Sequence, residues 1–377
     1  MTCCGIDVES GNPIEISSAE VVSSIRPAGD FSDAIYVAPG FIDIQVNGFA
    51  GVDYNNPATP QEDVARSIGA LLETGVTRFY PTVITGPPAD MVAALRNLSR
   101  AKDTAPNGDA IDGFHVEGPH ICPEEGPRGA HPRRWVRPPD IEEFRRWQDA
   151  TEGCLRIVTL SPEWPEAPRY IEQLVAEGVV VAIGHMQASA AQIGDAVAAG
   201  ATLSTHLGNG AHGVLRRHPN YIWEQLAEDR LMADFIVDGI HLDAAFLKVA
   251  MRAKTVERAV LVTDAAAPAG ATPGRYRLGE QDVDLTSDGR VVLAGTERLA
   301  GSALRMDRGI DNLMSLAGLT LRDAVRLATV NAARAGAVPG RTVGLAIGER
   351  ADFVQFRMNQ GVEVVATYIS GRKVWGR

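Results

Sequence analysis

Short apolar runs and amphipathic stretches alternate along most of this chain. Eight apolar runs have the length of buried β-strands, and they lie at residues 41–47, 76–81, 111–117, 156–161, 180–185, 202–206, 232–238 and 259–264. Apolar positions at helical spacing fill the intervals at 61–74, 88–101, 166–178, 189–199 and 243–254. This alternation predicts an α/β fold in which residues 41–339 form a TIM-like (β/α)8 barrel.

The two ends of the chain carry a different pattern. Residues 1–40 and 340–377 contain short β-like runs separated by Gly, Pro and Asp, for example "ADFVQF" and "VEVVATYISGRKVW". We expect these two segments to form a small β-sandwich built from both termini. Residues 274–300 predict a β-hairpin with its turn at "SDGR".

One connection of the predicted barrel is unusually long. It follows Glu117 and reads "GPHICPEEGPRGAHPRRWVRPPD", which is rich in Pro, Gly and charged residues. Long irregular loops in compact domains are often lids or binding loops, so we expect this segment to border a site.

Four of the predicted strands end in polar residues that can carry chemistry. These are Glu117, His185, His206 and Asp264. The carboxyl ends of all strands in such a barrel converge on one face, where catalytic groups lie. Two imidazoles and one carboxylate suit Zn²⁺ or a similar divalent ion, and three protein ligands leave a position open for water.

Each residue alone also has a structural explanation. A lone histidine is more often a hydrogen-bonded structural residue, a lone glutamate is often a cap or ion-pair partner, and Asp264 could cap a turn. Four such residues at equivalent positions favour a metal site. Such an ion lowers the pKa of bound water from 15.7 to about 7. Asp264, as a carboxylate that is not a ligand, is the candidate for acid–base catalysis in the hydrolysis of an amide or related bond.

Composition narrows the function further. The formal net charge of −11 argues against nucleic-acid binding, and an anionic substrate would need local cations. Arg216, Arg217 and His218 form one small basic cluster, which could equally be a solvated loop. No apolar run is long enough to predict a membrane span, and "MTCCGIDVES" does not resemble a secretory signal. The four cysteines lack CxxC spacing, which predicts reduced thiols in a cytoplasmic protein.

Several motifs, in their order and spacing, resemble those of the amidohydrolase superfamily and most closely the N-acetylglucosamine-6-phosphate deacetylase family. The resemblance covers the chain from about "VAPGFIDIQVNG" (37–48) to its end. The other motifs are "HVEGPH" (115–120), "GAH" (129–131), "IGH" (183–185), "STHLGNG" (204–210), "DGIHLD" (238–243), "VTDA" (262–265) and "LAGSAL" (299–304).

The resemblance implies a metal-dependent hydrolase barrel and assigns roles to residues of this chain. Glu117, His185 and His206 would bind the metal, and Asp264 and His131 would be catalytic, the latter beside the scissile carbonyl. The residues that would contact substrate are Ala130, His131, Asn209, Gly210, Arg217, His241, Leu299, Ala300 and Gly301. Arg217 would reach a phosphate across a dimer interface, and His241 would face the same group.

The sequence departs from the superfamily pattern at three places. Gln45 and Asn47 stand where many members have His-x-His, which predicts one ion and a hydrogen-bond scaffold beneath it. Gly208 and Gly210 replace larger residues, which predicts a freer loop and a wider or differently shaped pocket. His120 replaces a common aromatic residue and is expected either in the pocket or on the surface.

Together these features predict a cytoplasmic, homodimeric enzyme that deacetylates an amino-sugar phosphate. The expected cofactor is one divalent ion, with Zn favoured over Fe, Co or Mn. One alternative is an amidohydrolase acting on an unphosphorylated N-acyl sugar, an N-acyl amino acid or a cyclic amide. A second alternative is a catalytically silent metal-binding protein.

Overall fold

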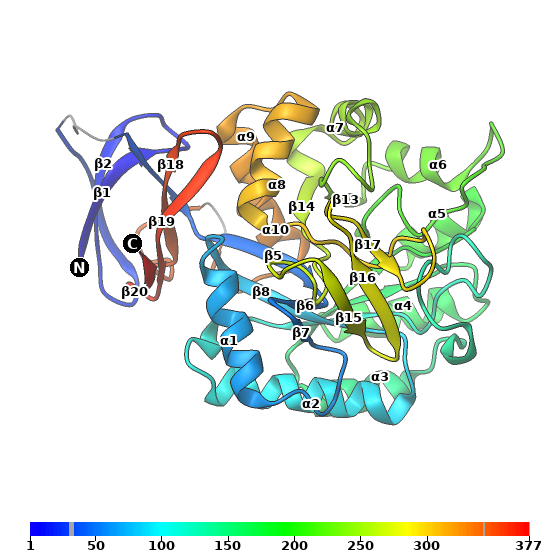
Figure 1. Ribbon diagram of the computed structural model, residues 1–377. Helices are drawn as coiled ribbons and strands as arrows, with labels where there is room; N and C mark the ends of the chain where they lie inside the picture. The colour runs from blue at the N-terminus through cyan, green and yellow to red at the C-terminus, as the bar shows by residue number, and fades with distance from the viewer. Residues whose placement is uncertain (30–33, 342–343, 377) are drawn as a thin grey trace.

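A parallel eight-stranded sheet forms the centre of the protein (Figure 1). The computed structural model describes residues 1–29, 34–341 and 344–376. An isolated bridge between Val46 and Ala265 connects the first strand of this sheet to the segment after the last, which closes the barrel. In chain order its strands are β5 (Phe41–Val46), β8 (Val76–Ile84), β9 (Phe114–Glu117), β10 (Leu155–Leu160), β11 (Val180–Ile183), β12 (Leu203–Ser204), β13 (Met232–Ile236) and β14 (Ala259–Val262).

Helices follow the barrel strands and cover them. All five predicted helices are present, as α1 (Gln61–Leu72), α2 (Pro88–Thr104), α4 (Ala167–Ala176), α5 (Ala190–Ala198) and α7 (Ala244–Arg258). Further helices and helical turns are η1 (Gly108–Ala110), η2 (Arg133–Trp135), α3 (Ile141–Ala150), α6 (Tyr221–Ala227), α8 (Met306–Asn312), η3 (Leu313–Ala317), α9 (Leu321–Leu327) and α10 (Val330–Ala335). Helix α1 illustrates the pattern, because Val64, Ile68 and Leu71 lie on one buried face at helical spacing. None of the described helices is long and apolar enough to span a membrane.

Strands from both termini form a second sheet beside the barrel, with both chain ends close to it (Figure 1). Its seven strands run in the order β20-β19-β18-β4-β1-β2-β3. They are β1 (Thr2–Asp7), β2 (Pro13–Ser18), β3 (Val22–Pro27), β4 (Ile35–Pro39), β18 (Phe353–Met358), β19 (Val362–Ile369) and β20 (Arg372–Gly376). Ile16, Phe353 and Tyr368 belong to a small hydrophobic core of this sheet, so the termini do build a separate β-structure. The domain boundaries at residues 40 and 340 stay a prediction.

A small antiparallel sheet is inserted after β14. The turn at "SDGR" does join two strands, β16 (Gln281–Leu285) and β17 (Val291–Leu293), as the sequence predicts. A third strand, β15 (Gly274–Leu278), pairs with β16 and was not anticipated. A two-stranded ribbon, β6 (Gly48–Phe49) and β7 (Val52–Asp53), follows β5.

The predicted strand ends need one correction. Glu117 is the last residue of its strand, but His185, His206 and Asp264 each lie two residues beyond theirs. Their φ angles are 49°, 28° and 49°, which are incompatible with an extended ladder. The chain therefore leaves the sheet just before each of these three residues.

Candidate metal centre and active site

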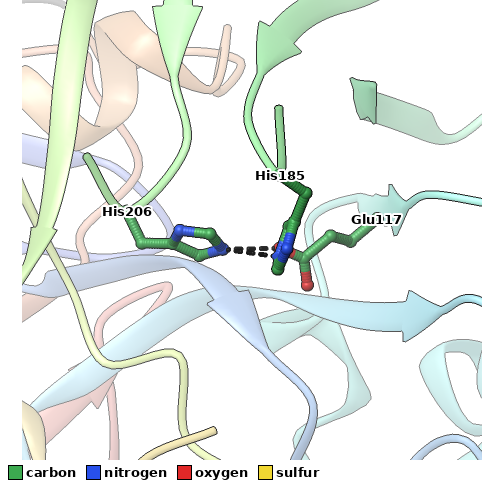
Figure 2. Close-up of side chains that lie close together, drawn as sticks. All are labelled: Glu117, His185 and His206. Carbon is green, nitrogen blue, oxygen red and sulfur yellow. Dashed lines mark hydrogen bonds and ion pairs between the residues drawn. The ribbon is translucent and has the colours of Figure 1, made fainter. Parts of the chain in front are cut away.

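Three side chains from three barrel strands meet at the carboxyl end of the barrel. Glu117 Oε1 lies 2.8 Å from His206 Nε2 and 3.2 Å from His185 Nε2. The two Nε2 atoms are 3.1 Å apart. Figure 2 shows the three side chains pointing toward one another. The structure thus brings together the three residues that the sequence predicts as metal ligands.

The arrangement of these donor atoms fits a divalent cation. Ligands at about 2.0–2.1 Å from a tetrahedral zinc ion stand roughly 3.3 Å from one another, close to the separations found here. Nδ1 of His185 donates to the backbone carbonyl of Pro127 at 2.8 Å, which leaves its Nε2 lone pair for an ion. Across residues 1–29, 34–341 and 344–376, no other group of three His, Cys, Asp or Glu side chains is placed to hold a metal.

The backbone around the site is strained and closely packed. Positive φ angles at His185, His206 and Asp264 cost about 1–3 kcal/mol each, and such residues cluster at functional sites. The loops on either side approach the His185 ring through glycines. A Cβ on Gly210 would lie 2.7 Å from His185 Nδ1, and one on Gly129 would lie 3.1 Å from its Cε1. Glycine at these positions therefore allows the loops to hold the imidazole in place.

Contact between Glu117 and His206 favours a proton on His206. Burial raises the pKa of Glu117, but hydrogen bonds from His185 and His206 outweigh it and hold the pKa well below its usual value. Burial also lowers the pKa of His206, but contact with the Glu117 carboxylate reverses this and raises it to about 9. A cation must displace that proton to bind, so metal affinity falls as pH falls.

Asp264 lies beside the three residues, held by two amides. Gln45 Nε2 donates to Asp264 Oδ1 at 3.2 Å, and Asn47 Nδ2 donates to the same oxygen at 2.6 Å. Burial, and then repulsion from Glu117, raises the pKa of Asp264 to about 6. Gln45 and Asn47 thus form a hydrogen-bond scaffold, and Asp264 has the pKa of a group that accepts and returns protons near neutral pH.

A cavity of about 140 Å³ opens onto this cluster. It contains Glu117, His185, His206 and Asp264 together with most of the residues predicted to contact substrate. Those residues are Ala130, His131, Asn209, Gly210, His241, Leu299, Ala300 and Gly301. Asn47, Ile84, Gly129, Ile236 and Leu278 complete the lining.

Two further histidines of the cavity are fixed by polar neighbours. Nδ1 of His131 lies 2.7 Å from the Thr85 hydroxyl, and Nδ1 of His241 lies 2.7 Å from the Asp238 carboxylate. Burial, and then the neighbouring His185, lowers the pKa of His131 to about 3. His131 is therefore a neutral imidazole at physiological pH, suited to hydrogen bonding rather than to ion pairing.

Arg217 does not line the cavity of its own chain. It is exposed, on the segment between β12 and α6, and belongs to none of the cavity's walls. Its predicted contact with a phosphate therefore stays a prediction that requires a second subunit.

One expectation about the departures is wrong, and another stays a prediction. His120 is neither in the cavity nor on the surface, because it is fully buried against the rings of Trp147 and Tyr170. The wider or differently shaped pocket expected from Gly208 and Gly210 stays a prediction. A Cβ on Gly208 would lie 2.7 Å from Leu242 Cδ2. At φ 103° it brings the loop onto this packed surface.

Sequence reasoning missed Thr85 and Asp238, which hold His131 and His241. The reason is visible for Thr85. The sequence predicts a strand over residues 76–81, but β8 continues to Ile84. Extending the run "VTRFYPTVI" would have placed Thr85 at the barrel mouth with the other strand-end residues. Asp238 had a signal too, since it lies three residues before His241 in "DGIHLD".

Comparison with known proteins identifies the family. The sequence pattern of the amidohydrolase family matches residues 36–374. The chain belongs to the amidohydrolase family. The resemblance inferred from its motifs is therefore confirmed.

Relatives within this family share most of the length of the chain. It is 33% identical over 359 residues to the N-acetylglucosamine-6-phosphate deacetylase of Bacillus subtilis, covering 93% of this chain and 89% of that protein. It is 37% identical over 355 residues to the human N-acetylglucosamine-6-phosphate deacetylase, covering 90% of this chain and 83% of that protein. A variant of the Mycobacterium smegmatis N-acetyl-D-glucosamine-6-phosphate deacetylase, solved in complex with N-acetyl-D-glucosamine-6-phosphate, superimposes with a TM-score of 0.89. That structure is 32% identical and covers 99% of both chains.

Proposed function

We propose that this amidohydrolase removes the acetyl group from N-acetylglucosamine-6-phosphate, releasing glucosamine-6-phosphate and acetate. The observation that carries the proposal is the meeting of Glu117, His185 and His206 with Asp264 at one cavity. The substrate class follows from the deacetylase relatives and from the match to a structure that holds this sugar phosphate.

The residues of the cavity divide the work of amide hydrolysis. An ion held by Glu117, His185 and His206 would polarise the acetyl carbonyl and make a water molecule more acidic. Asp264, with its raised pKa, takes the proton from the attacking water and passes it to the departing amine. His131 hydrogen-bonds the carbonyl oxygen as negative charge develops on it.

The substrate's phosphate needs cations or hydrogen-bond donors in an acidic protein. We assign this role to His241 in the cavity and to Arg217 supplied by the second subunit of a cytoplasmic homodimer. Arg217→Ala should then raise KM for the phosphorylated sugar far more than for the plain N-acetyl sugar. Equal effects on the two substrates, or a chain that sediments as a monomer while fully active, would remove this assignment.

We further propose one divalent ion per chain, with zinc as the favoured metal. Both amides at positions 45 and 47 contact Asp264, and neither is the imidazole that a second ion site would use. Fe²⁺, Co²⁺ and Mn²⁺ accept the same ligands.

Metal analysis combined with a substrate screen tests the function. The purified chain should contain about one divalent ion and should release acetate from N-acetylated hexosamine 6-phosphates faster than from plain sugars or N-acyl amino acids. Asp264→Asn should keep the metal and lose about 10²–10⁴-fold in kcat. Glu117→Gln should lose both the metal and the activity. Equal turnover in the wild type and Asp264→Asn would favour the silent metal-binding alternative.

A further inference from the structure

Three histidines of the cavity have a hydrogen-bond partner at Nδ1. The chemistry of that partner differs among them. For His185 it is the carbonyl of Pro127, and for His241 it is the carboxylate of Asp238. Carbonyl and ionised carboxylate oxygens only accept, so both rings must donate from Nδ1. For His131 the partner is the hydroxyl of Thr85, which can either donate or accept.

The surroundings of Thr85 decide the direction of that hydrogen bond. Thr85 follows β8 at the barrel mouth and is 3% exposed. Within the described parts of the chain, His131 Nδ1 is the one hydrogen-bond partner of its hydroxyl. If His131 donated, the buried hydroxyl proton of Thr85 would be left without an acceptor, which is costly. When the hydroxyl donates instead, Nδ1 accepts, and the single N–H of the neutral ring lies on Nε2.

Close packing holds the hydroxyl in this position. Gly118, directly after the candidate ligand Glu117, has φ 77°, and a Cβ on it would lie 2.2 Å from Thr85 Oγ1. No other residue type fits this approach, so Gly118 allows the backbone to press the hydroxyl toward His131. The strand-end ligand, the hydroxyl and the imidazole therefore form one packed unit.

We infer that Thr85 is a positioning residue that holds His131 in the tautomer with its proton on Nε2, facing the cavity. In that tautomer His131 donates to the carbonyl oxygen of the substrate amide. With the proton on Nδ1, the same ring would present a lone pair to that oxygen and repel it. The inference rests on the proposed hydrolysis for its catalytic consequence, whereas the tautomer itself is a property of the free protein.

Kinetics of two Thr85 variants test the consequence. Removing one donor to a developing oxyanion costs about 10²–10³ in kcat, and a valine leaves a fraction of the correct tautomer, so Thr85→Val should lose roughly 10–100-fold. KM should change little, because the ground-state substrate gains little from this donor. Thr85→Ser keeps the hydroxyl and should restore most of kcat.

Thr367→Val is the matched control for the loss of a buried hydroxyl. Thr367 is fully buried in the terminal sheet, and its hydroxyl donates to the Leu72 carbonyl at the same 2.7 Å. Its substitution should reduce stability to a similar extent and leave kcat unchanged.

Nitrogen-15 NMR of the zinc-loaded protein, labelled at histidine, tests the tautomer directly. The resonances lost in His131→Asn identify the ring, and they should report a protonated Nε2 in the wild type and in Thr85→Ser. In Thr85→Val they should shift toward a mixture of tautomers. A wild-type ring protonated on Nδ1, or a Thr85→Val variant as active as Thr367→Val, overturns the inference. Absence of turnover by the wild type on every N-acetylated sugar phosphate would instead overturn the proposed function, and the NMR result would still decide the tautomer.

Discussion

At the scale of single residues, both amides beside Asp264 donate to the same carboxylate oxygen. Hydrogen bonds to an ionised carboxylate favour that form, yet burial and the charge of Glu117 leave the pKa of Asp264 at about 6. A general base must be ionised, so the rate must fall as pH drops through this pKa. A bound cation lowers the pKa, so we expect the acid limb of kcat/KM to centre at or below about pH 6.

The hydrogen bond from Asn47 to Asp264 tests whether Asp264 is the general base, because its loss should shift the pKa in a known direction. Asn47→Ala removes a donor that lowers the pKa of Asp264, so the acid limb should move to higher pH by about one unit. The pH dependence of kcat/KM measures the shift, with circular dichroism at each pH to confirm that the variant stays folded. An unmoved limb in Asn47→Ala would mean that another group titrates.

At the scale of elements, the long loop after Glu117 is tied to the inserted β15–β17 sheet. Glu280, in the β15–β16 turn, accepts from Trp135 Nε1 at 2.6 Å and pairs with Arg134 at 2.7 Å. Gln281 Nε2 donates to the carbonyl of Ala130, a cavity residue. Two segments that wall the cavity thus hold each other in position.

Loss of the contacts between Glu280 and the long loop should affect substrate binding more than folding. The contacts are largely exposed, and exposed pairs contribute about 0–1 kcal/mol, so Glu280→Ala should raise KM roughly two- to five-fold. The melting temperature should stay nearly constant, and a protease should cut the loop faster. Asp284→Ala, which removes an ion pair with Arg275 inside the same sheet, is the control. If it raises KM equally, the effect belongs to the sheet and not to the tie.

The spacing of apolar residues explains why the barrel could be predicted from sequence. Buried parallel strands are continuous apolar runs, and the helices that cover them bury one face, so both leave clear patterns. Polar residues at several strand ends then located the site, although His185, His206 and Asp264 lie beyond the strands in left-handed backbone. The sequence predicts less well which side chains contact one another. Thr85 lies beyond the predicted end of its strand at Pro81, and the burial of His120 depends on two rings 27 and 50 residues away in the chain.

At the scale of the whole molecule, a buried charge network joins the barrel to the terminal sheet at the end opposite the site. Asp352, directly before β18, is fully buried. Its Oδ2 lies 2.7 Å from Arg78 Nε, on barrel strand β8, and 2.6 Å from Arg350 Nε. Arg341 donates to the backbone carbonyl of Asp352 at 3.0 Å. One carboxylate thus neutralises guanidinium groups from both parts of the fold.

Asp352→Asn should therefore destabilise the protein without touching its chemistry. Breaking a buried ion pair by removing one partner typically costs about 3–5 kcal/mol. Arg78 keeps a second ion pair with Asp112 at 3.1 Å, and Arg341 keeps one with Glu349 at 3.3 Å, so the loss should lie toward the lower end of that range. Urea unfolding should show a loss of this size, while metal content and kcat of the folded fraction should match the wild type. Asp323→Asn, at the start of α9, is the control; its carboxylate is partly exposed and accepts from the Thr320 hydroxyl, so its loss should cost less than about 1 kcal/mol. A loss below about 1 kcal/mol in Asp352→Asn would show that the network is dispensable.

The difference in unfolding free energy between the wild type and Asp352→Asn should depend on pH. That dependence distinguishes a loss of electrostatic interactions from a loss of packing. Burial raises the pKa of Asp352, but Arg350 and Arg78 outweigh it and hold the pKa below its usual value. The stabilisation is then complete above the unfolded pKa of about 3.9 and fades as pH falls toward the lower folded value. The gap in unfolding free energy between the wild type and Asp352→Asn should be constant at neutral pH and narrow below about pH 4. A gap that persists undiminished into that acidic range would point to lost packing, because packing has no reason to follow the protonation of a carboxylate.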